Sequence, residues 1–245
     1  MEKQTFLIKP DATELINEAA RKLVEYAHQC IAERGQFTFA LSGGSTPKAL
    51  YELLANEPWR SQMPWKNVIV LFGDERAVPP DDPRSNYRMA AQALLSHVEI
   101  PPENIWRWRG EAKDLDEAAR EYEMHLHELA GVIDLNLLGM GPDGHTASLF
   151  PHSPVLAEAE RLCVATPEAP LEPHVRRLTL TYSAINASRQ VWIFITGAEK
   201  AARLRQVLEG EREPHLLPVQ GVHPRNGELV WMLDSAVASR LKESQ

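Results

Sequence analysis

A single histidine, His145, stands in a glycine-rich segment beside an acid and two hydroxyl side chains. Residues 139–148 read Gly-Met-Gly-Pro-Asp-Gly-His-Thr-Ala-Ser, so Asp143 comes two residues before the histidine. An imidazole with an unperturbed pKa of about 6.5 is the side chain best suited to take a proton from water near neutral pH. The segment therefore predicts a general base at His145, and a purely structural histidine is the alternative.

A second glycine loop follows the apolar run at residues 37–41. The loop consists of Ser42, Gly43, Gly44, Ser45 and Thr46, and Pro47 comes next. Backbone N–H groups of such a loop, together with the start of the following helix, attract phosphate. A tight turn with Thr46 as the helix N-cap is the alternative. The loop matches neither a Walker A sequence nor a Gly-x-Ser-x-Gly elbow, so covalent serine catalysis has little support.

Charged residues follow two further apolar runs. Asp74, Glu75 and Arg76 come after residues 68–72, and Lys200 comes after residues 191–195. A lysine near the start of a helix opposes the helix dipole, which is expected if it serves an anionic ligand. Solvated surface charges are the alternative for both segments.

The sequence argues against two other kinds of site. The glycines at 139, 141 and 144 match a dinucleotide-binding pattern, but the segment lies in mid-chain, Pro142 interrupts it, and Pro151 limits any following helix to about two turns. His125 and His127 are two residues apart in a helical segment and so face different directions, and we predict no required metal.

Composition limits the classes of partner. The chain has 245 residues, 44% of them hydrophobic, and a formal net charge of -8, which argues against a broad surface for nucleic acid or an anionic membrane. Cys30 and Cys163 fit free thiols in a reducing cytoplasm, and we expect neither a signal peptide nor a membrane span, since no long apolar run occurs. The oligomeric state stays open, and a monomer is compatible with the sequence.

The apolar pattern predicts a single α/β domain over residues 1–245. We expect helices at 12–34 and about 86–95, strands at 37–41, 68–72, 132–138, 178–181 and 191–195, and a surface loop at 165–174. Strands that alternate with helices indicate a doubly wound, mostly parallel, Rossmann-like sheet with helices on both faces. Ligands of such sheets bind beyond the carboxyl ends of the strands, where these loops converge.

Taken together, the loops resemble those of the 6-phosphogluconolactonase family, in the superfamily that also contains glucosamine-6-phosphate deaminases. The resemblance rests on three motifs and runs over nearly the whole chain. The motifs are Leu41-Ser-Gly-Gly-Ser-Thr-Pro47, Asp74-Glu-Arg76 with Val78-Pro79 and Ser85-Asn86-Tyr87, and Gly139-x-Gly-x-Asp-Gly-His-Thr-Ala-Ser148 with Phe150-Pro151. The deaminases carry Asn-Glu-Pro after the shared Asp-Gly-His, where this sequence has Ser148-Leu-Phe-Pro151, and this difference favours the lactonase branch.

The resemblance implies hydrolysis of a phosphorylated sugar lactone, a small-molecule substrate, with no cofactor. His145 would act as the general base, Asp143 would orient it or bind a sugar hydroxyl, and Asp74 would bind substrate or tune the site. The phosphate and sugar oxygens would be held by Ser42, Gly43, Gly44, Ser45, Thr46, Arg76, Arg177 and Lys200. The alternatives are an amino-sugar phosphate isomerase, a sugar-phosphate sensor and a dehydrogenase.

Overall fold

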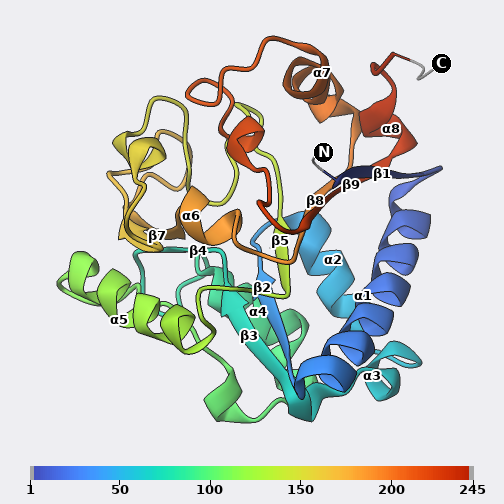
Figure 1. Ribbon diagram of the computed structural model, residues 1–245, viewed down its shortest axis with the longest axis vertical. Helices are drawn as coiled ribbons and strands as arrows, with labels where there is room; N and C mark the ends of the chain where they lie inside the picture. The colour runs from blue at the N-terminus through green and yellow to red at the C-terminus, as the bar shows by residue number, and fades with distance from the viewer. Residues whose placement is uncertain (1–2, 243–245) are drawn as a thin grey trace.

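Six parallel strands form the central sheet of the computed structural model, which describes residues 3–242. Their order across the sheet is β1-β9-β8-β5-β2-β3 (Figure 1). The bounds are β1 (Lys3–Lys9), β2 (Phe37–Leu41), β3 (Val68–Phe72), β5 (Leu135–Leu138), β8 (Gln190–Ile195) and β9 (Glu228–Asp234). Every residue of β2, β3 and β5 is buried, which explains why these strands are mostly apolar and do not alternate with polar residues; Thr38 and Asn136 are the polar members.

A second, smaller sheet has three antiparallel strands in the order β4-β7-β6. Its strands are β4 (Asp74–Arg76), β7 (Arg177–Leu180) and β6 (Cys163–Ala165). The chain enters this sheet directly from β3, because Gly73 is the only residue between β3 and β4. Gly73 also joins the two sheets, since its N–H donates to Leu41 of β2 and its carbonyl accepts from Leu180 of β7.

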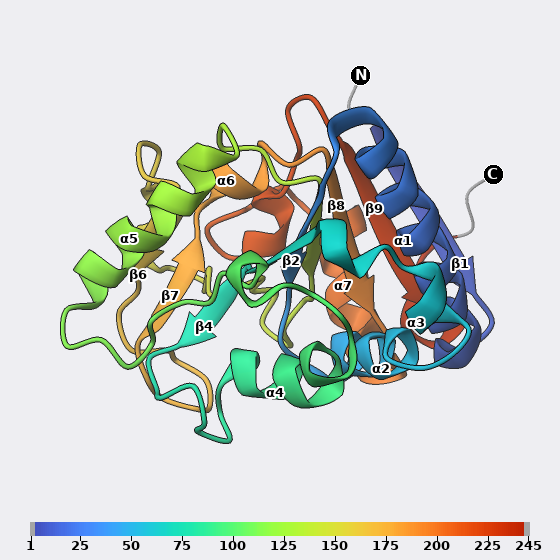
Figure 2. The same ribbon diagram turned by 90° about the horizontal axis from the view of Figure 1, so that it is seen from below.

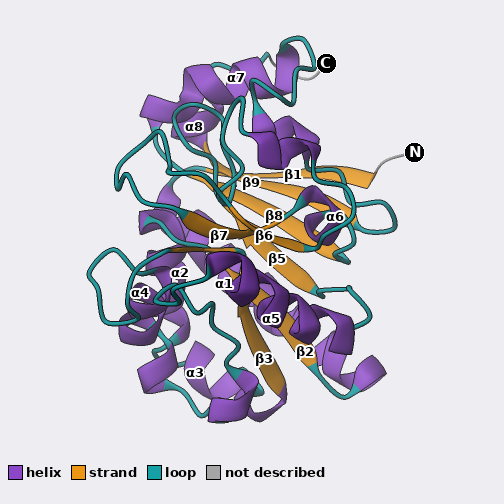
Figure 3. Cartoon of the chain, turned by 90° about the vertical axis from the view of Figure 1, so that its left-hand side faces the viewer, coloured by secondary structure: helices purple, strands orange, loops and turns teal. Residues whose placement is uncertain are grey.

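Helices and the small sheet cover the two faces of the central sheet. Helix α1 lies on one side, whereas α5, α6 and the small sheet lie on the other (Figures 1 and 2). Figure 3, viewed from the second side, shows β6 and β7 in front of the central strands. The α-helices are α1 (Ala12–Arg34), α2 (Ser45–Leu54), α3 (Trp59–Gln62), α4 (Asn86–Ala93), α5 (Leu115–Glu128), α6 (Tyr182–Ile185), α7 (Ala201–Glu209) and α8 (Ser235–Ala238). Short 3₁₀ helices span Trp65–Asn67, Leu95–His97, Pro102–Asn104, Pro154–Ala157, Ala198–Lys200 and Pro218–Gly221.

The bounds of α1 follow from local chemistry and confirm the predicted helix at 12–34. The Asp11 carboxylate accepts the backbone N–H of Glu14 at 2.9 Å, and this N-cap starts the helix. At the other end Gly35 adopts a left-handed φ of 80° and donates its N–H to Ile31 at 2.8 Å.

The strand order places a topological switch point between β2 and β5. From β2 the chain continues outward to β3, whereas from β5 it continues the opposite way to β8 and then β9. Loops that leave neighbouring strands in opposite directions open a crevice at the carboxyl ends. The glycine loops at 42–46 and 139–148 follow these two strands and therefore flank the crevice.

Several sequence expectations need correction. The strand predicted at 178–181 spans Arg177–Leu180 and belongs to the antiparallel sheet, and the strand predicted at 132–138 is confined to Leu135–Leu138. Helix α4 ends at Ala93, two residues early. Residues 145–150, directly after Gly144, are not helical; the chain there forms turns closed by a Thr146–Leu149 bridge.

Four strands, β1, β4, β6 and β9, were not predicted from the sequence, and one helix cap was predicted wrongly. Strands β1 and β9 were missed, although they pair along their full lengths. The apolar run of β9 at residues 229–233 was the available signal. Thr46 is not the N-cap of α2, because the helix starts at Ser45 and Gly44 is the N-cap. The Thr46 hydroxyl instead hydrogen-bonds the Thr196 hydroxyl at 2.8 Å.

Candidate active site

A cavity of about 460 Å³ opens at the carboxyl ends of β2, β3, β5 and β8. It brings together ten of the eleven residues that the sequence singled out, from segments far apart in the chain. These ten are Ser42, Gly43, Gly44, Ser45, Thr46, Asp74, Arg76, His145, Arg177 and Lys200. Asp143, the eleventh, is not in the wall but bonds directly to His145.

His145 is held by Asp143 in a defined orientation. The carboxylate Oδ1 lies 2.6 Å from the imidazole Nδ1 and also accepts the backbone N–H of His145 at 3.1 Å. Burial raises the pKa of Asp143, but the hydrogen bond and charge of His145 outweigh burial and hold this pKa below its usual range. With Nδ1 engaged as a donor to the carboxylate, Nε2 is the ring nitrogen left to accept a proton.

The first glycine loop is anchored from below by a buried tyrosine. The Tyr51 hydroxyl accepts the backbone N–H of Ser42 at 2.8 Å and donates to the Ser42 carbonyl at 2.9 Å. The Thr46–Thr196 hydroxyl contact ties the same loop to the segment that carries Lys200. The loop is thus fixed at both ends while its backbone borders the cavity.

The Asp74 carboxylate accepts hydrogen bonds from two side chains, and of these three residues the sequence predicted only Asp74 as part of the site. The Ser148 hydroxyl donates to its Oδ2 at 2.6 Å, and the Asn86 amide donates to its Oδ1 at 3.0 Å. Asn86 reaches this position because Gly43 lacks a side chain: a β-carbon there would lie 2.2 Å from Asn86 Oδ1. Asp74 is only 7% exposed, so the network holds a nearly buried carboxylate in place.

The neighbouring Glu75 has a structural role. Its carboxylate accepts the Ser85 hydroxyl and the backbone N–H groups of Arg76, Asn86 and Tyr87. Burial raises the pKa of Glu75, and these four donors oppose the shift. Glu75 therefore anchors the start of α4, which presents Asn86 to the site.

Two guanidinium groups enter the cavity with unused donors. Arg76 and Arg177 lie opposite each other in the β4–β7 ladder, and the Nε atom of each is buried without a hydrogen-bond partner among the described residues. Arg177 Nη2 donates to the Pro173 carbonyl at 2.9 Å, and its guanidinium carbon lies 6.0 Å from the Phe150 ring centre. Buried donors without partners are costly, so this pair is suited to an anion that supplies acceptors.

Sequence reasoning missed other parts of the cavity wall. Asn86 and Phe150 were noted in motifs but not assigned to the site, and the Phe150 ring packs 4.5 Å from the His145 ring centre. Leu171 and Glu172, in the segment predicted as a surface loop, also line the cavity. Their contribution has no local sequence signal, because it depends on how residues 166–176 fold back between β6 and β7.

The search for metal and membrane features covers residues 3–242. No group of three or more His, Cys, Asp or Glu side chains there is arranged to hold a metal ion. No helix in that part of the chain is long and apolar enough to cross a membrane. The expected independence from metals stays a prediction.

The switch-point sheet, with a His–Asp pair and three basic side chains at one cavity, defines a Rossmann-like α/β protein. A comparison with known protein families identifies the family. Residues 10–231 match the family described as glucosamine-6-phosphate isomerases/6-phosphogluconolactonase, and the chain belongs to this family.

Individual relatives cover almost the whole chain. A 6-phosphogluconolactonase of Synechocystis sp. is 41% identical over 95% of this chain and 99% of that protein. One from Mycobacterium tuberculosis is 38% identical over 96% and 97% of the two chains. The solved structure of 6-phosphogluconolactonase from Trypanosoma brucei has a TM-score of 0.85 and 30% identity, covering 99% of this chain and 100% of that one.

Proposed function

We propose that this chain is a carboxylic ester hydrolase that converts 6-phospho-D-glucono-1,5-lactone to 6-phospho-D-gluconate, a step of the oxidative pentose phosphate pathway. The observation that carries the proposal is one cavity that holds both the Asp143-oriented His145 and two guanidinium groups with unused buried donors. The similarity to lactonases over nearly the full length supports it.

In the proposed mechanism His145 is the general base. Nε2 takes a proton from a water molecule as the water oxygen bonds to the lactone carbonyl carbon, which gives a tetrahedral oxyanion. The oxyanion then collapses, the bond from carbon to the ring oxygen breaks, and His145 returns the proton to that oxygen. Asp143 stabilises the imidazolium that exists between the two transfers.

Binding is assigned to the cationic and glycine-rich walls. The Ser42–Thr46 backbone, Arg76, Arg177 and Lys200 hold the phosphate and sugar oxygens. Asp74, fixed by Ser148 and Asn86, accepts a sugar hydroxyl or tunes the site rather than taking a proton from the substrate.

The amino-sugar phosphate isomerase reading is the alternative within the same family. In that branch, by resemblance, the carboxylate at position 74 would abstract a proton, whereas here both of its oxygens already accept hydrogen bonds. Ammonia release from glucosamine 6-phosphate discriminates the two activities, and we expect none. Failure to bind a nicotinamide cofactor in a calorimeter likewise separates the lactonase from a dehydrogenase.

The central experiment measures hydrolysis of freshly prepared lactone by purified protein in the presence of a chelator. We expect catalysis without added metal and a loss of about 10²- to 10⁴-fold in kcat for His145→Ala. His127→Ala is the matched control, since His127 is exposed on α5 and does not line the cavity. Full turnover by His145→Ala would contradict the assigned base.

Location and partners belong to the same proposal. Free Cys30 and Cys163 fit the cytoplasm, and a small sugar phosphate is the expected partner rather than nucleic acid or membrane. We treat residues 1–245 as one catalytic domain. Sedimentation measurements on the purified protein decide whether it is monomeric.

A further inference from the structure

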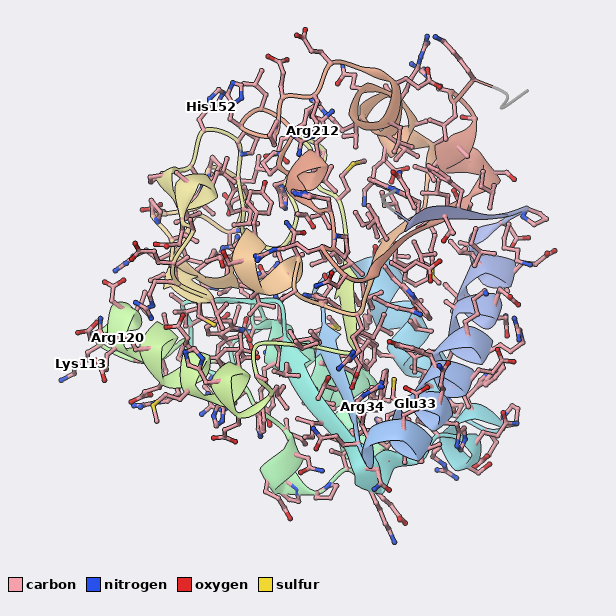
Figure 4. The ribbon with its side chains drawn as sticks, in the orientation of Figure 1. Glu33, Arg34, Lys113, Arg120, His152 and Arg212 are labelled. Atoms are coloured by element: carbon pink, nitrogen blue, oxygen red, sulfur yellow. The ribbon has the colours of Figure 1, made fainter. Side chains whose placement is uncertain are left out.

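A second cavity, of about 440 Å³, lies away from the active site, on the side of the molecule that carries α6. Figure 4 labels two of its wall residues, His152 and Arg212, near the top of the view. The rim also includes His215 and His223, and Tyr182 belongs to the wall. Every residue named here lies outside the wall of the active-site cavity.

The charge of this cavity opposes that of the whole protein. The chain has a formal net charge of -8, yet none of the described residues that line this cavity is acidic. Arg212 is exposed and forms no ion pair or side-chain hydrogen bond within residues 3–242. An arginine left unpaired at the mouth of an acid-free cavity attracts an anionic group.

Much of the rest of the wall is apolar or aromatic, and hydrogen bonds hold it in place. The Tyr182 hydroxyl donates to the Pro218 carbonyl at 2.6 Å, which fixes its ring. Gly221 packs on that ring so closely that a β-carbon would come within 2.4 Å of it. The Asn186 side chain bonds the Gly221 carbonyl at 3.0 Å and the His223 N–H at 2.8 Å, so both wall segments are held in place.

Hydrogen bonds connect the wall of this cavity to the segment that carries His145. His152, in a left-handed conformation with φ of 60°, donates its backbone N–H to the His215 carbonyl at 2.9 Å. The Val219 N–H donates to the Gly144 carbonyl, adjacent to His145, at 3.0 Å. Residues 215–219 thus connect the second cavity to the loop of the first.

We propose that this cavity is a second ligand site, for a small organic anion with a flat aromatic body. Tyr182, Leu156 and Pro214 accept the ring, while Arg212 and the imidazoles of the rim receive the anionic group. The size of the cavity suits a ligand of this kind. The site goes beyond the proposed hydrolysis and does not depend on it.

The test uses 8-anilinonaphthalene-1-sulfonate, which combines an aromatic body with one negative charge and fluoresces when bound. We expect saturable binding to the native protein that saturating 6-phosphogluconate does not displace. Arg212→Gln should raise Kd about three- to tenfold, a modest change because the guanidinium is exposed. Arg240→Gln, at an exposed arginine outside the cavity, should leave Kd unchanged.

Two variants of one rim residue, Ala157, distinguish the effect of charge on binding from the effect of side-chain size. Ala157 is exposed and lines the cavity, so Ala157→Glu adds a carboxylate at the mouth while Ala157→Gln adds the same bulk without charge. We expect Ala157→Glu to bind the dye several-fold more weakly than Ala157→Gln, with lactone hydrolysis unchanged in both variants. Absence of binding, displacement by 6-phosphogluconate, or equal affinity of the two variants would overturn the site and leave the hydrolase assignment intact.

Discussion

Gly141 lies against the His145 imidazole with no room for a side chain between them. A β-carbon on Gly141 would come within 2.1 Å of ring atoms Cε1 and Nδ1, and within 2.9 Å of Asp143 Oδ1. The Gly141 N–H also donates to the His145 carbonyl at 2.9 Å. The glycine therefore lets the loop fold tightly around the His–Asp pair, and its role is to position the base.

The first prediction concerns this contact. Gly141→Ala should displace the imidazole and lower kcat about 10²-fold, because a base moved by an ångström is out of reach of the water that it must deprotonate. Gly139→Ala is the matched control, since a β-carbon there has nothing within 4 Å, and any effect should be confined to KM. Steady-state kinetics on both variants make the comparison. Equal losses of kcat would contradict the positioning role.

The second prediction concerns the charge of Asp143. Asp143→Asn should reduce kcat on the order of 10²-fold, since the amide no longer stabilises the imidazolium. The effect on stability has a defined sign. Because the folded-state pKa of Asp143 is lowered, its ionised form stabilises the fold above the unfolded pKa of about 3.9, and this contribution is lost as pH falls through the folded value.

Denaturant unfolding at several pH values checks this sign. The difference in unfolding free energy between the wild type and Asp143→Asn should shrink as the solution becomes acidic. Asp116→Asn, at an exposed acid in the first turn of α5, serves as the control. A difference that grows in acid would show that the His145 contact does not stabilise the carboxylate.

The third prediction concerns Arg177, which is 4% exposed. Burial lowers its pKa, and nearby Asp74 opposes the shift. Arg177→Gln should raise KM about ten- to a hundredfold with a smaller change in kcat, because a charge-assisted bond contributes about 1.5–3 kcal/mol. Inorganic phosphate should raise the melting temperature of the wild type but not of the variant.

A neighbouring residue provides the control for Arg177. Arg176→Gln removes a side chain that bonds the Thr166 carbonyl and does not line the cavity, so KM should stay near the wild-type value. A large rise of KM in both variants would point to a general disturbance of β7 rather than to a phosphate contact.

The fourth prediction concerns the two thiols. Cys30 and Cys163 are fully buried; burial raises the pKa of Cys30 to about 11 and also raises that of Cys163. Because the thiolate is the reactive form, a thiol reagent at mildly alkaline pH should modify neither cysteine in the native protein. Both should react in denaturant. Rapid reaction of the native protein would show that one thiol is accessible.

Part of the secondary structure, and the residues that we propose for catalysis and phosphate binding, could be predicted from the sequence because local signals indicate them. The cap at Asp11 and the stop at Gly35 bound α1, and the apolar runs at 37–41 and 68–72 match β2 and β3 in full. The sequence did not show which of the two sheets each strand joins. The run at 178–181 looks like the others, yet hydrogen bonding to β4 and β6 places it in the antiparallel sheet.

The sequence by itself was enough to propose which side chains carry the chemistry: an imidazole after a glycine turn, a nearby acid, a phosphate-type loop and a few cations. Only the tertiary structure decided that they meet. Parallel order β8-β5-β2-β3 brings four loop ends to one edge, while β7 delivers Arg177 from the second sheet and Ser148 reaches Asp74 across 74 residues of chain. Such contacts depend on strand order and long-range packing, and no local pattern of residues encodes these.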